Sequence, residues 1–293
     1  MSIETERFQV AATDGYTLGA YRYRAASPRG IVVVASATGV PQAFYRRFAQ
    51  FVATEHYDVV TFDYRGLGES APSSLKGFEM DYRDWATKDL EAVVAMLSAE
   101  SLPLYLVGHS YGGHALGLIS NHECIRAACF FGVGSGWHGW MPRLEGIRVW
   151  LMWHLIAPVL VQARGYLGWS VLGMGEDLPM GVYRQWKRWC GFPGYFFDDP
   201  QQPQMKHKFA QVKTPIRAFT ALDDLWALPA SRDAFVRHYT SSRVEKTEIE
   251  PKAFGAAIGH MGYFRSRAQP LWPQALAFFE AHQGVSPEAA GGR

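Results

Sequence analysis

The chain lacks the features that mark several classes of protein. Its 29 Lys and Arg residues nearly balance its 27 Asp and Glu residues, so the formal net charge is only +2. A nucleic-acid-binding face needs an excess of positive charge, and we therefore expect no nucleic-acid partner. Only three of the 293 residues are cysteines, and none lies in a Cys-x-x-Cys pattern. This excludes the common cysteine metal motifs and suits a reducing compartment.

Long apolar runs are also missing. The longest, residues 149–161, is interrupted by His154 and Pro158 and is too short to span a bilayer. We expect it to form a buried helix or a helix of a cap over the core. The first ten residues, MSIETERFQV, are polar and do not resemble a signal peptide. Together these absences predict a cytoplasmic protein with no transmembrane segment.

What the chain does contain is a sequence typical of a catalytic serine. Residues 104–113, LYLVGHSYGG, are a short apolar run that ends in glycines, and a run of small and apolar residues follows. This is the G-x-S-x-G pattern in the strand–turn–helix context that it requires. Alone, the pattern also fits a glycine-rich turn with a capping serine, but the flanking runs favour a nucleophile. The sequence therefore predicts that Ser110 is exposed on a sharp turn at the end of a strand.

The rest of the chain alternates between strand-like and helix-like segments. Apolar or alternating runs predict strands at residues 8–10, 18–23, 31–35, 59–62, 104–107, 127–133, 216–220 and 244–249. Helical spacing between most of them favours an α/β fold with a mainly parallel, doubly wound sheet. About 80 residues separate the strands near 131 and 216, far more than one crossover needs.

This long connection is rich in aromatic residues, and glycines and prolines divide it into short predicted helices. We expect residues 136–205 to be an inserted helical cap, or lid, between two parts of one core, residues 1–135 and 206–293. Ligands of open α/β sheets bind at the carboxyl ends of the strands. A cap of this composition predicts an apolar pocket over Ser110.

A serine hydroxyl needs a base and an acid that orients the base. His260 follows the last predicted strand in a glycine-rich loop, whereas His109 is next to Ser110 but points the other way out of the turn. The strand at 216–220 ends in two acids, and we favour Asp224 over Asp223 as the partner of His260. Serine, acid and histidine then follow one another in the order expected of this type of fold.

The developing negative charge on a substrate oxygen needs two backbone N–H donors. Tyr111 follows Ser110 at the start of the predicted helix and is the first candidate. The second should come from the loop after the strand at 31–35. In that loop, Ala37 and Thr38 are the alternatives.

Five motifs together resemble the α/β-hydrolase superfamily over essentially the full chain: ATGVPQ, DYRGLGES, GHSYGG, LDDLW and GHMGYF. Among its members, the chain is similar to bacterial predicted hydrolases of the serine aminopeptidase and monoacylglycerol-lipase-like group. Most of those relatives carry His-Gly in the loop after the third strand, where this chain has Ser36-Ala37-Thr38-Gly39. Members that resemble homoserine acetyltransferase keep Thr-Gly there, so the resemblance also leaves room for acyl transfer.

The predicted activity is hydrolysis of carboxylic esters through a Ser-His-Asp triad and an acyl-enzyme. The expected substrate is a small molecule with a medium or bulky apolar acyl or alcohol part. No metal and no organic cofactor is needed for this chemistry. The alternatives are an acyltransferase, thioesterase or peptidase with the same triad, or a non-catalytic binding protein on the same scaffold. Exposed aromatic residues of the cap are candidates for a homodimer contact or a membrane surface.

Overall fold

A computed structural model describes residues 3–284 of the chain. Eight strands form one sheet in the order β1-β2-β4-β3-β5-β6-β7-β8. Their bounds are β1 Thr5–Ala11, β2 Thr17–Tyr23, β3 Ile31–Ala35, β4 Asp58–Phe62, β5 Leu104–His109, β6 Ile125–Phe131, β7 Ile216–Ala221 and β8 Val244–Ile249. The strands β1 and β2 pair in antiparallel fashion, as do β2 and β4, and all other neighbours are parallel. The predicted fold class is confirmed, and each predicted strand is present.

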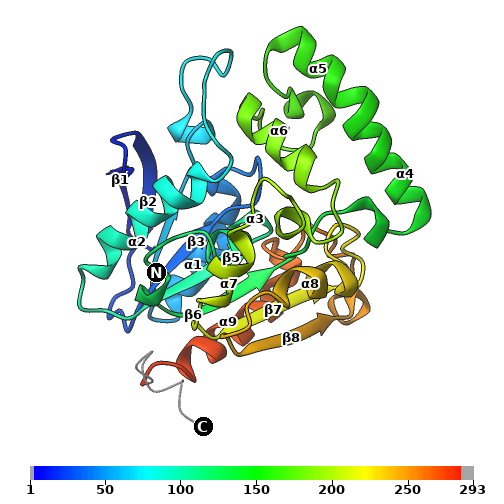
Figure 1. Ribbon diagram of the computed structural model, residues 1–293. Coiled ribbons are helices and arrows are strands. Elements are labelled where there is room, and N and C mark those ends of the chain that lie inside the picture. The colour runs from blue at the N-terminus through cyan, green and yellow to red at the C-terminus, as the bar shows by residue number, and fades with distance from the viewer. Residues whose placement is uncertain (1–2, 285–293) are drawn as a thin grey trace.

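Helices cover both faces of the sheet (Figure 1). The α-helices are α1 Arg46–Thr54, α2 Glu91–Ser98, α3 Tyr111–Ala115, α4 Arg143–Leu151, α5 Ala157–Arg164, α6 Met180–Trp189, α7 Met205–Ala210, α8 Pro229–Val236 and α9 Trp272–Glu280. Two π-helical turns, η3 Trp85–Leu90 and η6 Met152–Ile156, precede α2 and α5. The 3₁₀ turns are η1 Gln42–Tyr45, η2 Gly68–Ser70, η4 His122–Cys124, η5 His138–Trp140, η7 Trp169–Leu172, η8 Tyr195–Phe197, η9 Pro251–Phe254 and η10 Ser266–Leu271.

Each strand of the sheet centre is buried on both sides. In β3, Val33 belongs to the core that lies under α2, α3 and α8, whereas Val32 and Val34 belong to the core under α1 and α9. This explains the continuous β-branched run, because a strand covered on both faces has no polar side. The strand order reverses at β3, which lies between β4 and β5. The loops after β3 and β5 therefore diverge at a topological switch point, where open sheets bind ligands.

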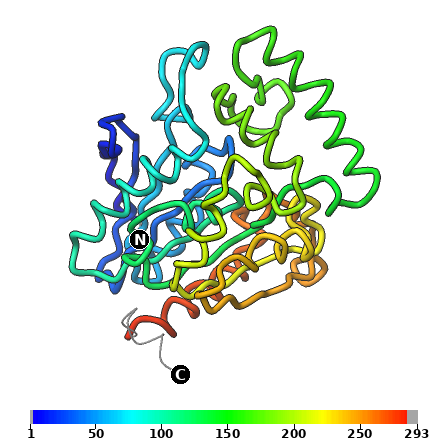
Figure 2. The backbone as a smooth tube through the Cα atoms, in the orientation of Figure 1, coloured from blue at the N-terminus to red at the C-terminus, as the bar shows by residue number. Residues whose placement is uncertain are grey.

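The connection between β6 and β7, which we call the β6–β7 segment (residues 132–215), carries α4, α5 and α6 (Figures 1 and 2). The apolar run at residues 149–161 forms a helix, as predicted, but the length that we expected is wrong. The helix is continuous from Arg143 to Arg164, 22 residues, and by length it is not too short to cross a bilayer. The π-helical turn η6 directly precedes Pro158. A proline has no N–H to donate, and a local change in the hydrogen-bond pattern of a helix is where one is accommodated.

This helix is apolar on two faces. On its inner face, the buried side chains are Val149, Met152, Trp153 and Ala157. Only 28% of the most apolar 18-residue stretch of the helix is buried. Most of the exposed large apolar side chains of the described chain lie on it: Leu144, Ile147, Trp150, Leu151, Leu155, Ile156 and Val159. In length and composition alone, its 22 residues would suffice to cross a membrane. Its inner face nevertheless packs on protein, so this is weak evidence for a span.

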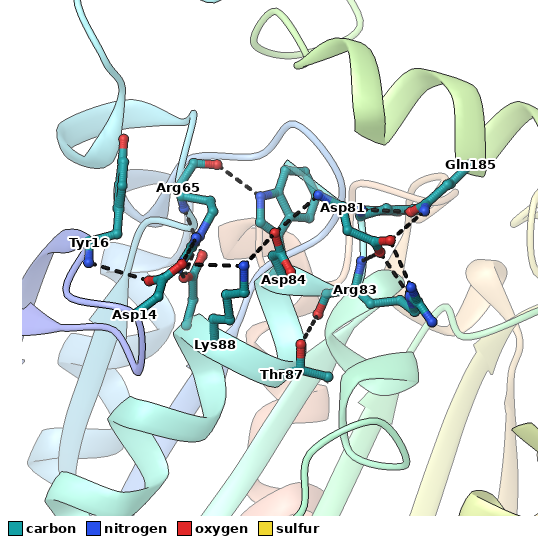
Figure 3. A network of polar contacts seen from close by, with 12 residues as sticks. Asp14, Tyr16, Arg65, Asp81, Arg83, Asp84, Thr87, Lys88 and Gln185 are labelled. Atoms are coloured by element: carbon teal, nitrogen blue, oxygen red, sulfur yellow. Dashed lines mark hydrogen bonds and ion pairs between the residues drawn. The ribbon is translucent and has the colours of Figure 1, made fainter. Parts of the chain in front are cut away.

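A polar network holds the loop that follows β4 (Figure 3). The buried Arg65 guanidinium forms ion pairs with Asp89 at 2.6 Å and with Asp14 at 2.7 Å. The indole N–H of Trp85 donates to the Arg65 carbonyl at 2.8 Å. Burial raises the pKa of Asp89 to about 6, an effect that the neighbouring Arg65 opposes. The network fixes this loop beside η3, on the side where the β6–β7 segment lies.

Candidate active site

Ser110 lies on a strained turn between β5 and α3. Its backbone has φ +51° and ψ −112°, a region that residues other than glycine rarely adopt. The glycines around it permit two close backbone approaches. A Cβ on Gly108 would lie 2.5 Å from the Gly113 nitrogen, and one on Gly112 would lie 2.0 Å from the Ala35 carbonyl oxygen of β3. The predicted turn is therefore present, with the serine at the end of the strand.

Asp224 and His260 lie next to each other at the carboxyl ends of β7 and β8. The His260 Nδ1–H is 3.0 Å from both carboxylate oxygens of Asp224. That carboxylate is fully buried and also accepts hydrogen bonds from the Tyr263 hydroxyl at 2.9 Å and from the Trp226 and Ala227 N–H groups. A carboxylate with this many donors is held in one orientation, and it in turn fixes the imidazole.

Asp223, the alternative acid, points elsewhere. Its two carboxylate oxygens accept hydrogen bonds at 2.9 Å from the backbone N–H groups of Ile258 and Gly259. These two residues immediately precede His260. Asp223 therefore anchors the loop that carries the imidazole, while Asp224 contacts the imidazole itself.

The two candidates for the second N–H donor also differ. The Ala37 N–H donates to the Tyr45 hydroxyl at 2.9 Å. Within residues 3–284, neither the Thr38 N–H nor the Tyr111 N–H has a hydrogen-bond acceptor. Tyr111 opens α3 directly after Ser110, and Thr38 lies in the loop after β3. The structure thus leaves Thr38, and not Ala37, with a free donor beside the switch point.

His109 connects three loops of the site, a role that sequence reasoning missed. Its Nε2–H donates to the His260 carbonyl at 2.8 Å, so Nδ1 must be the acceptor of the Tyr45 hydroxyl, also at 2.8 Å. Tyr45 in turn accepts from Ala37. Burial lowers the pKa of His109 to about 3, which keeps the ring neutral. The chain of hydrogen bonds runs in one direction, from the loop after β3 to the loop of His260.

A cavity of about 270 Å³ lies over Ser110 and His260. Its walls are aromatic, with Trp169 and Trp186 from the β6–β7 segment and Trp226 from the core. Among the described residues that line it, none is Asp, Glu, Lys or Arg. The cavity is therefore apolar and uncharged, apart from the groups at the reacting centre and a few neutral polar side chains.

His114 lines this cavity as well, one helical turn after Ser110. Its Nε2–H donates to the Gly134 carbonyl at 2.9 Å, and burial lowers its pKa to about 3. The ring therefore stays neutral, and its Nδ1 has no hydrogen-bond partner among the described residues. The sequence analysis gave His114 no part in the site. Its spacing of four residues from Ser110 is the signal that could have found it.

Comparisons with solved structures identify the fold. A soluble variant of monoglyceride lipase from Saccharomyces cerevisiae, solved in complex with a substrate analogue, superposes with a TM-score of 0.67. The superposition covers 97% of this chain and 95% of the lipase chain at 17% identity. The Pyrococcus furiosus esterase Pf2001 superposes with a TM-score of 0.60, over 96% of this chain and 94% of the esterase chain at 15% identity. The chain has the α/β-hydrolase fold.

Two sequence comparisons find similarity over part of the chain. The profile of the family described as serine aminopeptidase, S33, matches residues 26–161. The curated monoglyceride lipase of Saccharomyces cerevisiae is 31% identical over 100 residues. That stretch is 33% of this chain and 30% of the length of the relative. Both agree with the group that the sequence motifs resemble.

Proposed function

We propose that this α/β-hydrolase is a serine hydrolase that cleaves carboxylic esters. The observation that carries the proposal is the Asp224–His260 pair, which shares one cavity with Ser110 on its strained turn. His260 is the general base, Asp224 orients it, and the Tyr111 and Thr38 N–H groups are the oxyanion donors. A positioned base activates a serine hydroxyl, which is otherwise a poor nucleophile.

In the first half of the proposed reaction, Ser110 Oγ forms a bond to the ester carbonyl carbon while His260 Nε2 takes the hydroxyl proton. The carbonyl oxygen becomes an oxyanion held by the two N–H groups. The bond to the alcohol oxygen then breaks, and His260 gives the proton to the leaving alcohol. In the second half, His260 takes a proton from water, the water oxygen attacks the acyl carbon, and the acid leaves as Ser110 regains its proton.

We propose that residues 136–205 act as a cap and that the substrate is uncharged. An unpaired charge is costly to bury, and the described lining offers no carboxylate to an ammonium group. This favours an ester hydrolase over an aminopeptidase, which must bind a free amino group. Thioesterase activity and acyl transfer use the same triad, and the Ser36-Ala37-Thr38-Gly39 loop keeps acyl transfer as the second candidate.

Matched substrates test the charge preference. We expect kcat/KM for the p-nitrophenyl ester of butyric acid to exceed that of 4-(trimethylammonio)butyric acid by at least about 100-fold, because the ammonium would be buried without a partner. The quaternary ammonium has no lone pair and cannot attack its own ester. The ester of 4-acetamidobutyric acid controls for length and polarity. Equal or better hydrolysis of the ammonium ester would contradict the proposal. Added alcohols that divert the acyl group from water would indicate acyl transfer.

We also propose a cytoplasmic location and a homodimer. The three unpaired cysteines support the location, because disulfides are rare in a reducing compartment. The proposed dimer interface is the outer face of the helix Arg143–Arg164. Its exposed apolar side chains recur at the spacing of a helix–helix contact: Leu144, Ile147, Leu151 and Leu155. Sedimentation velocity should give the mass of a dimer, and Leu155→Glu should give that of a monomer. Gln162→Glu, the matched control, adds the same charge without removing an apolar side chain.

A monomer in both proteins would contradict the dimer. If the wild type then floats with lipid vesicles and Leu155→Glu does not, the same face contacts a membrane surface instead.

A further inference from the structure

Part of the β6–β7 segment, residues 175–185, lies directly on three loops of the core, and we call it the strap. Its glycines bring backbone against backbone. A Cβ on Gly175 would lie 2.5 Å from the Gly39 carbonyl oxygen, and one on Gly181 would lie 1.7 Å from the Met80 carbonyl oxygen. Side-chain atoms do not approach a backbone this closely, so no residue with a Cβ fits at either position. The backbone of the strap therefore packs closely against the core at Gly175 and at Gly181.

Glu176 makes the first polar contact of the strap. Its N–H donates to the Gly39 carbonyl at 2.8 Å, and its carboxylate accepts from the Gly68 N–H at 2.6 Å. Within residues 3–284, no cation lies at ion-pair distance from this half-buried carboxylate, and burial raises its pKa. The Gly68 N–H is therefore the polar group that holds this carboxylate against the loop after β4.

Gln185 makes the second contact, from α6 (Figure 3). Its side-chain oxygen accepts from the Tyr82 N–H at 2.6 Å, and its side-chain nitrogen donates to Asp81 at 2.7 Å. The Tyr82 ring also stacks on Trp189 of the same helix, with ring centroids 5.4 Å apart. Tyr82 is thus held by the β6–β7 segment through both its backbone and its ring.

Both contacts lead to Thr38. The backbone N–H of Glu176 holds Gly39, the neighbour of Thr38 in the chain, while the Glu176 carboxylate ties the strap to Gly68. The Tyr82 hydroxyl lies 2.5 Å from the Thr38 side-chain oxygen. Within residues 3–284, the Thr38 N–H itself has no acceptor. We propose that Glu176 and Gln185 are positioning residues that set the direction of the Thr38 N–H, so that the strap completes the oxyanion hole. This inference rests on the proposed function.

The expected loss of rate depends on how strongly the stabilisation of the oxyanion falls when the N–H donor moves away from it. An oxyanion donor must lie about 2.7–3.1 Å from the charged oxygen, and a misplacement of about 1 Å can cost about 100-fold in rate. Glu176→Ala keeps the backbone N–H that bonds to Gly39 but removes the carboxylate that ties the strap to Gly68, so the strap is free to shift together with Gly39 and Thr38. We therefore expect this variant to lower kcat by about 10- to 100-fold and to change KM by less than about twofold. Glu176→Gln keeps an oxygen that accepts from Gly68 and should recover most of the rate.

The decisive measurement is binding of an aryl trifluoromethyl ketone. Ser110 Oγ adds to its carbonyl carbon and creates an oxyanion in the same position as in the reaction. Its affinity should fall in Glu176→Ala by the same factor as kcat. Asp177→Ala is the matched control, since Asp177 bonds to Ser170 and Arg164 within the β6–β7 segment and does not contact the core. It should leave both quantities unchanged.

A double-mutant cycle separates shared from independent action. If Glu176 and Gln185 hold the same donor, the double variant Glu176→Ala/Gln185→Ala should lose little more than the worse single variant. Losses in kcat that multiply, or a lower melting temperature with unchanged ketone affinity, would overturn the inference.

The two proposals fail differently. Full activity in Glu176→Ala, together with loss of activity in Ser110→Ala, overturns the role of the strap alone. Activity that persists in Ser110→Ala overturns the proposed function and the inference with it.

Discussion

Replacement of Ser110 by alanine is expected to lower kcat for a short-chain p-nitrophenyl ester on the order of a million-fold, as when the nucleophile of a serine triad is removed. The reason is that no other group can form the acyl-enzyme. The Asp224–His260 pair and the two N–H donors would remain, but without a nucleophile they contribute only binding and charge stabilisation. Steady-state hydrolysis followed by p-nitrophenolate release measures the loss.

Ser120→Ala is the matched control for this substitution. Ser120 is an exposed serine whose N–H and hydroxyl bond to Glu91 at 2.8 Å, far from the cavity lining. It should keep wild-type turnover. Equal melting temperatures for the two variants would show that Ser110→Ala is folded. Near-wild-type turnover in Ser110→Ala would reject Ser110 as the nucleophile.

Asp224→Asn carries the second large effect, a loss in kcat on the order of 10,000-fold. The amide that replaces the carboxylate can donate a hydrogen bond to His260 Nδ1, and the imidazole then carries its proton on Nε2. That tautomer cannot take the proton of Ser110. The same p-nitrophenyl ester assay measures the loss.

Asp223→Asn is the natural comparison, because the two acids are adjacent and the substitutions are identical. The remaining amide oxygen of residue 223 can still accept from one of the N–H groups of Ile258 and Gly259. We expect a loss of less than about tenfold, of the size of one weakened hydrogen bond. The reverse order of effects would assign the triad acid to Asp223.

Much of the fold was predictable because its signals are local. The buried run before Ser110 and the glycines around it specify a strand and a turn without reference to distant residues. Asp224 and His260 were predictable as candidates, since each follows a strand and parallel strands end at one edge of the sheet. The choice between Asp223 and Asp224 was harder, because two adjacent acids differ only in the direction that the turn gives each side chain.

Other parts depend on contacts that no local pattern contains. Ala37 and Thr38 were equivalent in the sequence, and the distinction comes from the Tyr45 hydroxyl, which occupies the Ala37 N–H. Glu176 and Gln185 meet residues more than 100 positions away. The helix at residues 149–161 was predicted but its full length, Arg143–Arg164, was not, because the added residues at its ends include Arg143, Glu145, Arg148 and Arg164, which are not part of the apolar run.

The hydrogen-bond chain through Tyr45 and His109 has a consequence for how the site responds to acidity. Both His109 and His114 have a pKa of about 3, well below the range of about pH 5 to 8 in which histidine usually titrates. Across that range the hydrogen bonds of these two rings keep the same donors and acceptors. A change in rate with pH therefore does not come from either histidine, and Asp89, whose pKa burial raises to about 6, is the scaffold group that titrates there beside the reacting groups.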